Sequence, residues 1–215
     1  MIDAGALTLY IAAALLLAIT PGPGIFYVAA RTLSGGRAEG IASSFGTGVG
    51  GIVHVVAGAA GVSAIVLASA ELFTLLKILG VIYLAWIGVR TILAARREPL
   101  RFSIDNGGAA PSGVRRAFRE GVIVEALNPK TAAFFLAFIP HFVDPSTGSV
   151  ALQFVVLGLV SVTLNTLADI VVAFIAGRIC DGATTRPKLV RRLRAFSGAS
   201  MIMLAALLAT ARRPG

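Results

Sequence analysis

The feature that most restricts the fold of this chain is a series of six long apolar runs. A transmembrane helix needs about 20 mainly apolar residues, because it rises about 1.5 Å per residue through a hydrocarbon core about 30 Å thick. The runs lie near residues 6–29, 41–67, 72–95, 118–142, 151–177 and 195–211. The sequence therefore predicts an all-α integral membrane protein with six transmembrane helices. The last run is the shortest and is followed by Arg212 and Arg213, so five spans with an inner C-terminus are the alternative.

Composition argues against other classes of protein. With 57% hydrophobic and only 13% charged residues, a soluble fold could not cover its apolar mass. The net charge of +9 comes from short basic clusters without interleaved aromatic residues, which does not fit a nucleic acid partner. The single Cys180 excludes an internal disulfide and a thiol relay. The sequence contains no nucleotide-binding loop, nucleophile elbow or zinc-ligand spacing. We therefore expect that the chain is not an enzyme and that it binds neither a cofactor nor a metal ion.

The positions of Lys and Arg predict the orientation. Cytoplasmic connections of membrane proteins carry an excess of these residues. Most of them here follow the first, third and fifth runs, whereas only Arg212 and Arg213 fall on the opposite side. The pattern predicts that both termini face the outside of the cell.

The six runs divide into two halves of three. We expect a single transmembrane domain, 1–215, made of a first repeat, 1–95, a flexible cytoplasmic linker, 96–117, and a second repeat, 118–215. An odd number of spans per half gives the halves opposite orientations, as in inverted-repeat transporters. One shift of the chain superposes Pro21 on Pro129, Phe26 on Phe134, Ala29 on Ala137 and Gly50 on Gly158.

Proline interrupts the first and the fourth runs. Proline lacks an N–H group and leaves the carbonyl one turn earlier without its donor, which lipid tolerates only where protein or water replaces that donor. The half-helix ends then offer amides to an anion and carbonyls to a cation. We predict substrate binding at these breaks rather than simple packing kinks. The residues concerned are Thr20, Pro21, Gly22, Pro23 and Gly24 in the first run and Asn128, Pro129 and Lys130 in the fourth.

Polar residues from several runs reach similar depths. Helical rise places Pro21, His54, Lys130 and Asn165 near the middle of the bilayer, with Glu125 and Asp169 slightly shallower. A charge at that depth costs about 2.5 to 3.5 kcal/mol unless it has a partner or water. We therefore add Asn165 to the predicted substrate site.

The same depth makes Glu125, Asp169 and His54 candidates for proton coupling, because a carboxyl group in a low dielectric holds a proton more readily. Two alternatives are open. Lys130 could form an ion pair with Glu125 or Asp169, and His54 could be a hydrogen-bonded packing residue.

The second run is rich in glycine. Gly46 and Gly50 form a pair of small residues one helical turn apart. Such pairs let two helices approach closely in lipid, so close helix packing is the simplest interpretation of this run.

Taken together, the motifs resemble those of one family of bacterial secondary transporters. They are Thr20-Pro21-Gly22-Pro23, the glycine-rich run with His54, Phe118-Arg119-Glu120-Gly121, Leu127-Asn128-Pro129-Lys130, Phe134-Phe135 and Pro140-His141-Phe142. The chain is similar, over nearly its whole length, to the lysine exporter and homoserine/threonine exporter (LysE/RhtB) family.

The resemblance implies export of an amino acid or a derivative across a bacterial inner membrane, driven by the proton gradient. It also implies that residues 20–23 and 128–130 form the binding region. Many relatives have Asn where Glu125 stands, and a carboxylate there fits either a cationic substrate or an ion pair with Lys130. A non-transporting membrane scaffold and an exporter of another small metabolite or a cation are the alternatives. Whether the chain forms a homo-oligomer is left open.

Overall fold

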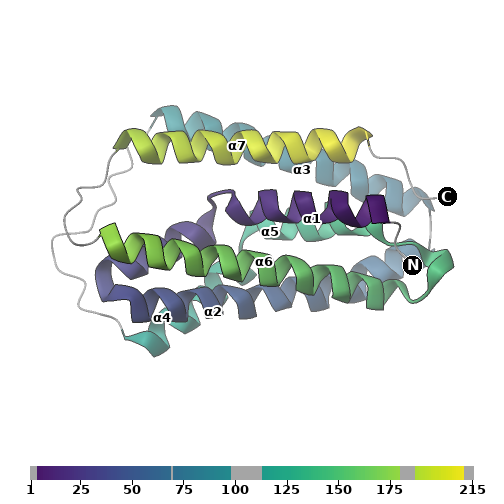
Figure 1. The fold of residues 1–215 in the computed structure, drawn as a ribbon. Coiled ribbons are helices and arrows are strands. Elements are labelled where there is room, and N and C mark those ends of the chain that lie inside the picture. Colours follow the sequence, from purple (N-terminus) through teal and green to yellow (C-terminus); the bar gives the residue numbers. More distant parts are fainter. Residues whose placement is uncertain (1–3, 69, 98–112, 180–186, 211–215) are drawn as a thin grey trace.

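The computed structural model describes residues 4–68, 70–97, 113–179 and 187–210, and the regular secondary structure of these residues is all helical. The α-helices are α1 (Ala4–Ile19), α2 (Pro23–Ala68), α3 (Ala70–Arg97), α4 (Val114–Ala126), α5 (Pro129–Ala133), α6 (Val150–Ile179) and α7 (Pro187–Thr210). The long α-helices run along one direction in a single bundle, and the short α4 is inclined to them (Figure 1). A π-helix, η1 (Phe134–Phe138), and two 3-10 segments, η2 (Ile139–Phe142) and η3 (Pro145–Thr147), connect α5 to α6.

Several helices are long and apolar enough to cross a membrane. Three pass by length and composition, within Pro23–Gly61, Lys77–Ala94 and Val150–Arg178. A fourth is added if α4 and the segment Pro129–Phe142, which meet at 42°, form one bent span. Shorter apolar stretches occur at Gly5–Ile19 and Ala195–Thr210. The described residues thus form a multi-pass helical membrane protein, and the plan of six spans stays a prediction.

Helix α2 folds back on itself at Gly36. This residue has φ 79° and ψ −179°, a conformation that glycine adopts without steric cost. Along a straight helix Gly24 and Thr47 would lie more than about 30 Å apart. Instead, a Cβ atom at Gly24 would lie 3.7 Å from Thr47 Cγ2. The part of α2 before Gly36 therefore runs against the part after it, as the turn at the left of Figure 1 shows.

The basic residues gather at one end of the bundle. The turn of α2, the ends of α3 and α6 and the starts of α4 and α7 lie at the left in Figure 1. The start of α1 and the end of α7 lie at the opposite end. Basic residues in these left-hand segments include Arg31, Arg37, Arg115, Arg116, Arg119, Arg178, Arg191 and Arg192.

The molecule is apolar outside and polar inside. Leu127, Val56 and Leu152 expose 77%, 63% and 63% of their surface, whereas Ser43 and Asp169 expose none. A water-soluble protein has the reverse distribution, because burying polar groups without partners is costly. The exposed side chains suit contact with lipid tails, where only the interior can satisfy polar groups.

A cluster of aromatic rings packs the middle of the bundle. The rings of Phe134 and Phe138, both in η1, stack 5.0 Å apart, and Tyr10 on α1 meets Phe142 at 5.2 Å. All four side chains are buried. This cluster anchors α1 against the chain that follows the second helix break.

Two pairs of helices touch through their backbones. A Cβ atom at Gly50 on α2 would lie 2.5 Å from the Val122 carbonyl oxygen on α4, and one at Gly46 would clash with the Phe118 carbonyl oxygen. Gly88 on α3 and Gly198 on α7 meet in the same way, with 2.7 Å from a Cβ at Gly88 to the Gly198 oxygen. The close packing predicted for Gly46 and Gly50 is confirmed.

Two connections lie at opposite ends of the bundle, with the edges of the predicted linker at one end and the turn before α6 at the other. Most of the predicted linker, residues 98–112, lies outside the described residues, and α3 and α4 take up its two edges. At the opposite end, Asp144 accepts hydrogen bonds from the Ser146 hydroxyl at 2.7 Å and the Ser146 N–H at 2.8 Å. These bonds lower the pKa of the Asp144 carboxyl and fix the turn before α6.

Candidate functional site

The two helix breaks meet inside the bundle through Lys130. This side chain exposes 3% of its surface. Its ammonium donates hydrogen bonds to the carbonyl oxygens of Leu17, at 3.1 Å, and Thr20, at 2.9 Å. Leu17 lies in the last turn of α1 and Thr20 directly follows it. Pro21 cannot donate to the Leu17 carbonyl because it has no N–H group, and Thr20 N donates to that carbonyl at 3.2 Å. A cation from the second break therefore caps the helix that the first break ends.

The second break is stabilised by residues next to it. Asn128 Oδ1 accepts a hydrogen bond from Lys130 N at 3.0 Å, which caps α5. Asn128 Nδ2 donates to Glu125 Oε2 at 2.9 Å, and the Thr131 hydroxyl donates to Glu125 Oε1 at 2.6 Å. The Glu125 carboxyl, which is 1% exposed, thus links the end of α4 to the start of α5.

Glu125 also lies beside the start of α2. A Cβ atom at Gly24 would be 2.7 Å from Glu125 Oε2. Because a helix N-terminus carries a partial positive charge, this position favours a carboxylate. A Cβ atom at Gly22 would be 3.1 Å from Lys130 Cε, so the first break has little spare room. Side chains of the protein thus occupy both half-helix ends of the first break.

Asp169, on α6, is fully buried. Its Oδ2 lies 2.7 Å from the Thr47 hydroxyl, and its Oδ1 has no hydrogen-bond partner within the described residues. The Thr47 hydroxyl also lies 2.8 Å from the Ser44 carbonyl oxygen. A hydroxyl group has one hydrogen to donate. Both contacts are satisfied together when Asp169 carries a proton and donates it to Thr47.

The remaining predicted residues lie around the same centre. His54 Nε2 is 2.9 Å from the Glu125 carbonyl oxygen, and the His54 ring lies 5.8 Å from the Phe135 ring. These contacts fit the packing alternative for His54. Lys130 lies within electrostatic range of both Glu125 and Asp169. The ammonium has two carboxyl groups as neighbours, while its hydrogen bonds go to the backbone of α1.

A small cavity borders this centre. The cavity has room for about one water molecule. Its polar wall consists of Thr47, Glu125, Thr131, Ser161 and Asn165. Its apolar wall includes Leu17, Phe135 and Val162. Glu125 and Asn165 were predicted from the sequence, whereas the three hydroxyl residues were not.

A signal for one of these hydroxyls was present in the sequence. Ser161, Asn165 and Asp169 are spaced by four residues, which places them on one face of α6. Thr47 and Thr131 lie on other helices, and only the folded chain brings them to this face. In the described part of the chain, no three His, Cys, Asp or Glu side chains lie close enough to hold a metal ion.

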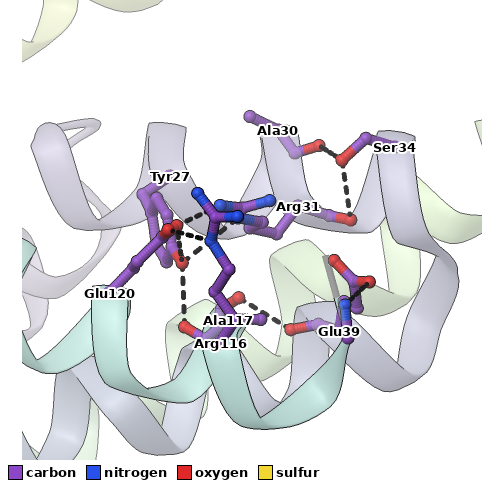
Figure 2. A network of polar contacts seen from close by, with 10 residues as sticks. Tyr27, Ala30, Arg31, Ser34, Glu39, Arg116, Ala117 and Glu120 are labelled. Atoms are coloured by element: carbon purple, nitrogen blue, oxygen red, sulfur yellow. Dashed lines mark hydrogen bonds and ion pairs between the residues drawn. The ribbon is translucent and has the colours of Figure 1, made fainter. Parts of the chain in front are cut away.

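An ionic network joins α2 to α4 at the basic end (Figure 2). Arg31 pairs with Glu120 Oε2, and Arg116 Nε donates to Glu120 Oε1 at 2.8 Å. The Tyr27 hydroxyl donates to the Ala117 carbonyl oxygen at 2.8 Å. The Arg31 and Glu120 side chains are 18% and 31% exposed. The network holds together the segment that follows the first break and the segment that precedes the second.

The fold and this centre define a multi-pass membrane protein built from interrupted helices. The family model for the LysE type translocator matches residues 15–212. The chain belongs to the LysE type translocator family, as its motifs predicted, and is therefore a transporter and not an enzyme.

Similar proteins occur in several bacteria. An uncharacterized membrane protein of Vibrio cholerae is 28% identical over 204 residues, which cover 94% of this chain and 96% of that protein. The homoserine/homoserine lactone efflux protein of Salmonella typhimurium is 28% identical over 204 residues, covering 94% and 95%. The leucine efflux protein of an Enterobacter species is 26% identical over 207 residues, covering 94% and 93%. No solved structure matches the chain.

Proposed function

We propose that this chain exports small amino acids or amino acid derivatives from the bacterial cytoplasm in exchange for protons. The observation that carries the proposal is the meeting of two helix breaks beside buried Lys130, Glu125 and Asp169, next to a polar cavity. Buried ionisable groups within a membrane bundle characterise ion and substrate pathways. The efflux proteins among the relatives support the direction of transport and the substrate class.

The packing of the helices supports two inverted repeats of three spans. In this plan α1 with the first part of α2 corresponds to the chain from α4 to η2. The second part of α2 then corresponds to α6, and α3 to α7. Exchanging the halves turns the contact of α2 with α4 into that of α6 with α1, and both contacts are present. The contacts α2 with α6 and α3 with α7 are unchanged by the exchange.

We place the basic end of the bundle in the cytoplasm of a bacterium, with the protein in the inner membrane. Positively charged connections stay inside during insertion, and the described arginines gather at one end. The first residues of α1 and the last residues of α7 lie at the opposite side of the bundle, so both termini face outward in this proposal.

Asp169 is the proposed proton carrier. Its hydrogen bonding with Thr47 and Ser44 suits the protonated form, and its second oxygen has no partner within the described residues. A carboxyl group that gains and loses a proton beside a substrate site can couple the two movements. Glu125 borders the cavity itself and is the proposed contact for the substrate.

Uptake into everted membrane vesicles tests the proposed export. The panel consists of homoserine, threonine, leucine, lysine and homoserine lactone, with an acidic interior to drive antiport. We expect at least one compound to accumulate, a protonophore to abolish the accumulation, and Asp169→Asn to reduce it at least tenfold. Asp144→Asn, in the exposed turn before α6, is the matched control and should transport normally.

The result against the proposal is a folded wild-type protein that moves none of the compounds. A scaffold role would then be favoured, and substitutions at Lys130 and Asp169 should leave that role intact. Accumulation that persists with the protonophore would leave export standing and remove the proton coupling.

A further inference from the structure

We propose that the cavity bordered by Glu125 is a site for a protonated primary amine, and that the transporter favours amines whose carboxyl group is masked as an ester, lactone or amide over free zwitterions. The inference rests on the proposed export function and narrows its substrate class. It follows from which hydrogen-bonding groups of the cavity wall are still available to a ligand.

Two hydroxyls in the wall have already donated their hydrogens within the protein. The Thr131 hydroxyl donates to Glu125 Oε1 at 2.6 Å. The Tyr10 hydroxyl donates to the Leu157 carbonyl oxygen at 2.7 Å, so its 2.5 Å contact with Ser161 uses the hydrogen of Ser161. Since a hydroxyl has one hydrogen and two lone pairs, Thr131 and Ser161 can only accept hydrogen bonds from a ligand.

The third hydroxyl and the carboxylate complete an acceptor surface. The hydrogen of Thr47 goes to Ser44 O or to Asp169 Oδ2, both within the protein. The Glu125 carboxylate accepts hydrogen bonds, and Asn165 can present either its oxygen or its nitrogen. A ligand with several donors and no acceptor fits this wall, and a primary ammonium group has three N–H donors.

A substrate carboxylate has no cationic partner at this place. Within the described residues that form the wall there is no Lys, Arg or His. Two of the three donors of the nearest cation, Lys130, are held by the Leu17 and Thr20 carbonyl oxygens. Glu125 already lies against the start of α2, so a second carboxylate would be repelled there.

The balance of buried charges in the centre also favours a protonated amine as the ligand. Lys130 can balance one of the two buried carboxyl groups, Glu125 and Asp169. The other needs a proton or an external cation, because an unbalanced charge at this depth is costly. An ammonium group bound at Glu125 therefore replaces a proton, which makes exchange of the two a property of the site.

The size of the cavity matches the head of such a ligand. Room for about one water molecule is also room for an ammonium group. Leu17, Phe135 and Val162 line the apolar side, and the carbon atoms next to the nitrogen would need the cavity to widen along this side.

Three compounds with the same side chain test the inference on purified protein in detergent. They are L-leucine methyl ester, L-leucine and N-acetyl-L-leucine methyl ester, which has no ammonium group. Dissociation constants come from titration of the melting temperature or from calorimetry. We expect the methyl ester to bind at least tenfold more tightly than leucine, and the acetylated ester not to bind.

Variants of the cavity wall assign the binding to this site. Glu125→Gln should weaken binding of the methyl ester at least tenfold, while Asp144→Asn, an acidic residue of the exposed turn, should not change it. If Glu125→Gln does not give a monodisperse protein, Ser161→Ala and Thr131→Val replace it. Each removes one acceptor, and each should weaken the ester about threefold.

Several outcomes would overturn the inference. Leucine could bind as tightly as its ester, or the ester could bind equally well to the variants. Sodium chloride could also raise the melting temperature of the wild type, relative to choline chloride, and block the ester, which would assign the cavity to Na⁺. Proton-driven leucine transport in vesicles combined with equal affinities would refute only this inference. Selective ester binding without transport of any compound would refute only the proposed function.

Discussion

The two helix breaks of this protein resemble one another in sequence but are stabilised differently. At the second break, Asn128, Thr131 and Glu125 form hydrogen bonds across two to six residues of sequence. At the first break, the carbonyl oxygens of Leu17 and Thr20 accept hydrogen bonds from a lysine 113 and 110 residues away, and Leu17 O also accepts a local one from Thr20 N at 3.2 Å. The second break is therefore complete by itself, whereas the first depends on the other half of the molecule.

This difference indicates which break can change during transport. Moving Lys130 away would leave the first break without its cap but would leave the bonds from Asn128 to Glu125 in place. The end of α1 and the start of α2 are thus the parts that respond to the state of the other half. The following predictions test this dependence.

Lys130→Met should have the largest effect. It removes the donor to two buried carbonyl oxygens and the only cation next to two buried carboxyl groups among the described residues. Breaking a buried charge interaction from one side costs about 3 to 5 kcal/mol. We expect a loss of that size in the free energy of unfolding, measured in SDS mixed micelles, and no transport.

Arg119→Met removes a cation from the exposed face of α4 and is the matched control, with an expected loss below about 0.5 kcal/mol. Equal losses in the two variants would mean that the first break does not depend on Lys130.

Asn128→Ala should have the next largest effect on the free energy of unfolding. It removes the cap of α5 and the amide donor to Glu125, and losing such a cap costs about 1 to 2 kcal/mol. Asn128→Ser keeps a capping oxygen and should recover part of the loss. The same unfolding assay measures both variants, and a larger loss for Asn128→Ala than for Lys130→Met would reverse the comparison of the two breaks.

A double-mutant cycle of Pro21→Ala with Lys130→Met should show a coupling of about 1 kcal/mol. Alanine at this position supplies the helical N–H group, four residues on, that proline withholds from Leu17 O, so the loss of Lys130 should cost less in that background. Pro129→Ala is the control, because the Lys130 ammonium does not bond to the helix before that proline. Additive effects in the Pro21 cycle would remove the proposed role of Lys130 as a cap.

Glu120→Gln should have the smallest effect. Its bonds to Arg31 and Arg116 join the segments that flank the breaks but are partly exposed to solvent. Ion pairs of this kind contribute about 0 to 1 kcal/mol and are screened by salt. We expect the difference in stability from the wild type to shrink between 50 mM and 1 M NaCl, because the Debye length falls to about 3 Å at 1 M salt. A loss above that range, unaffected by salt, would make this network as important as the breaks.

The sequence predicted much of the centre because polar residues in apolar runs are informative. Helix breaks at Pro21 and Pro129 are present as expected from the missing N–H groups. Lys130, Glu125 and Asp169 are buried, as their depth along the runs required. These expectations need only local rules of helix geometry and solvation.

The partners of these residues could not be predicted in the same way. An ion pair of Lys130 with Glu125 or Asp169 was the open alternative, and the ammonium donates instead to the backbone of α1. Depth along a helix does not give rotation about its axis, and rotation decides which groups face one another. For the same reason Thr47 and Thr131 were missed, since nothing local distinguishes them from hydroxyls that bond back to their own helix.

The glycine contacts described above also have a mechanical consequence. Where Gly50 of α2 meets Val122 of α4, and Gly88 of α3 meets Gly198 of α7, main chain lies on main chain. Few side-chain atoms lie between the helices there to absorb a displacement, so we expect each pair to move as one body. A cycle that exposes the centre first to one side of the membrane and then to the other would then be carried by motion of these two bodies relative to each other.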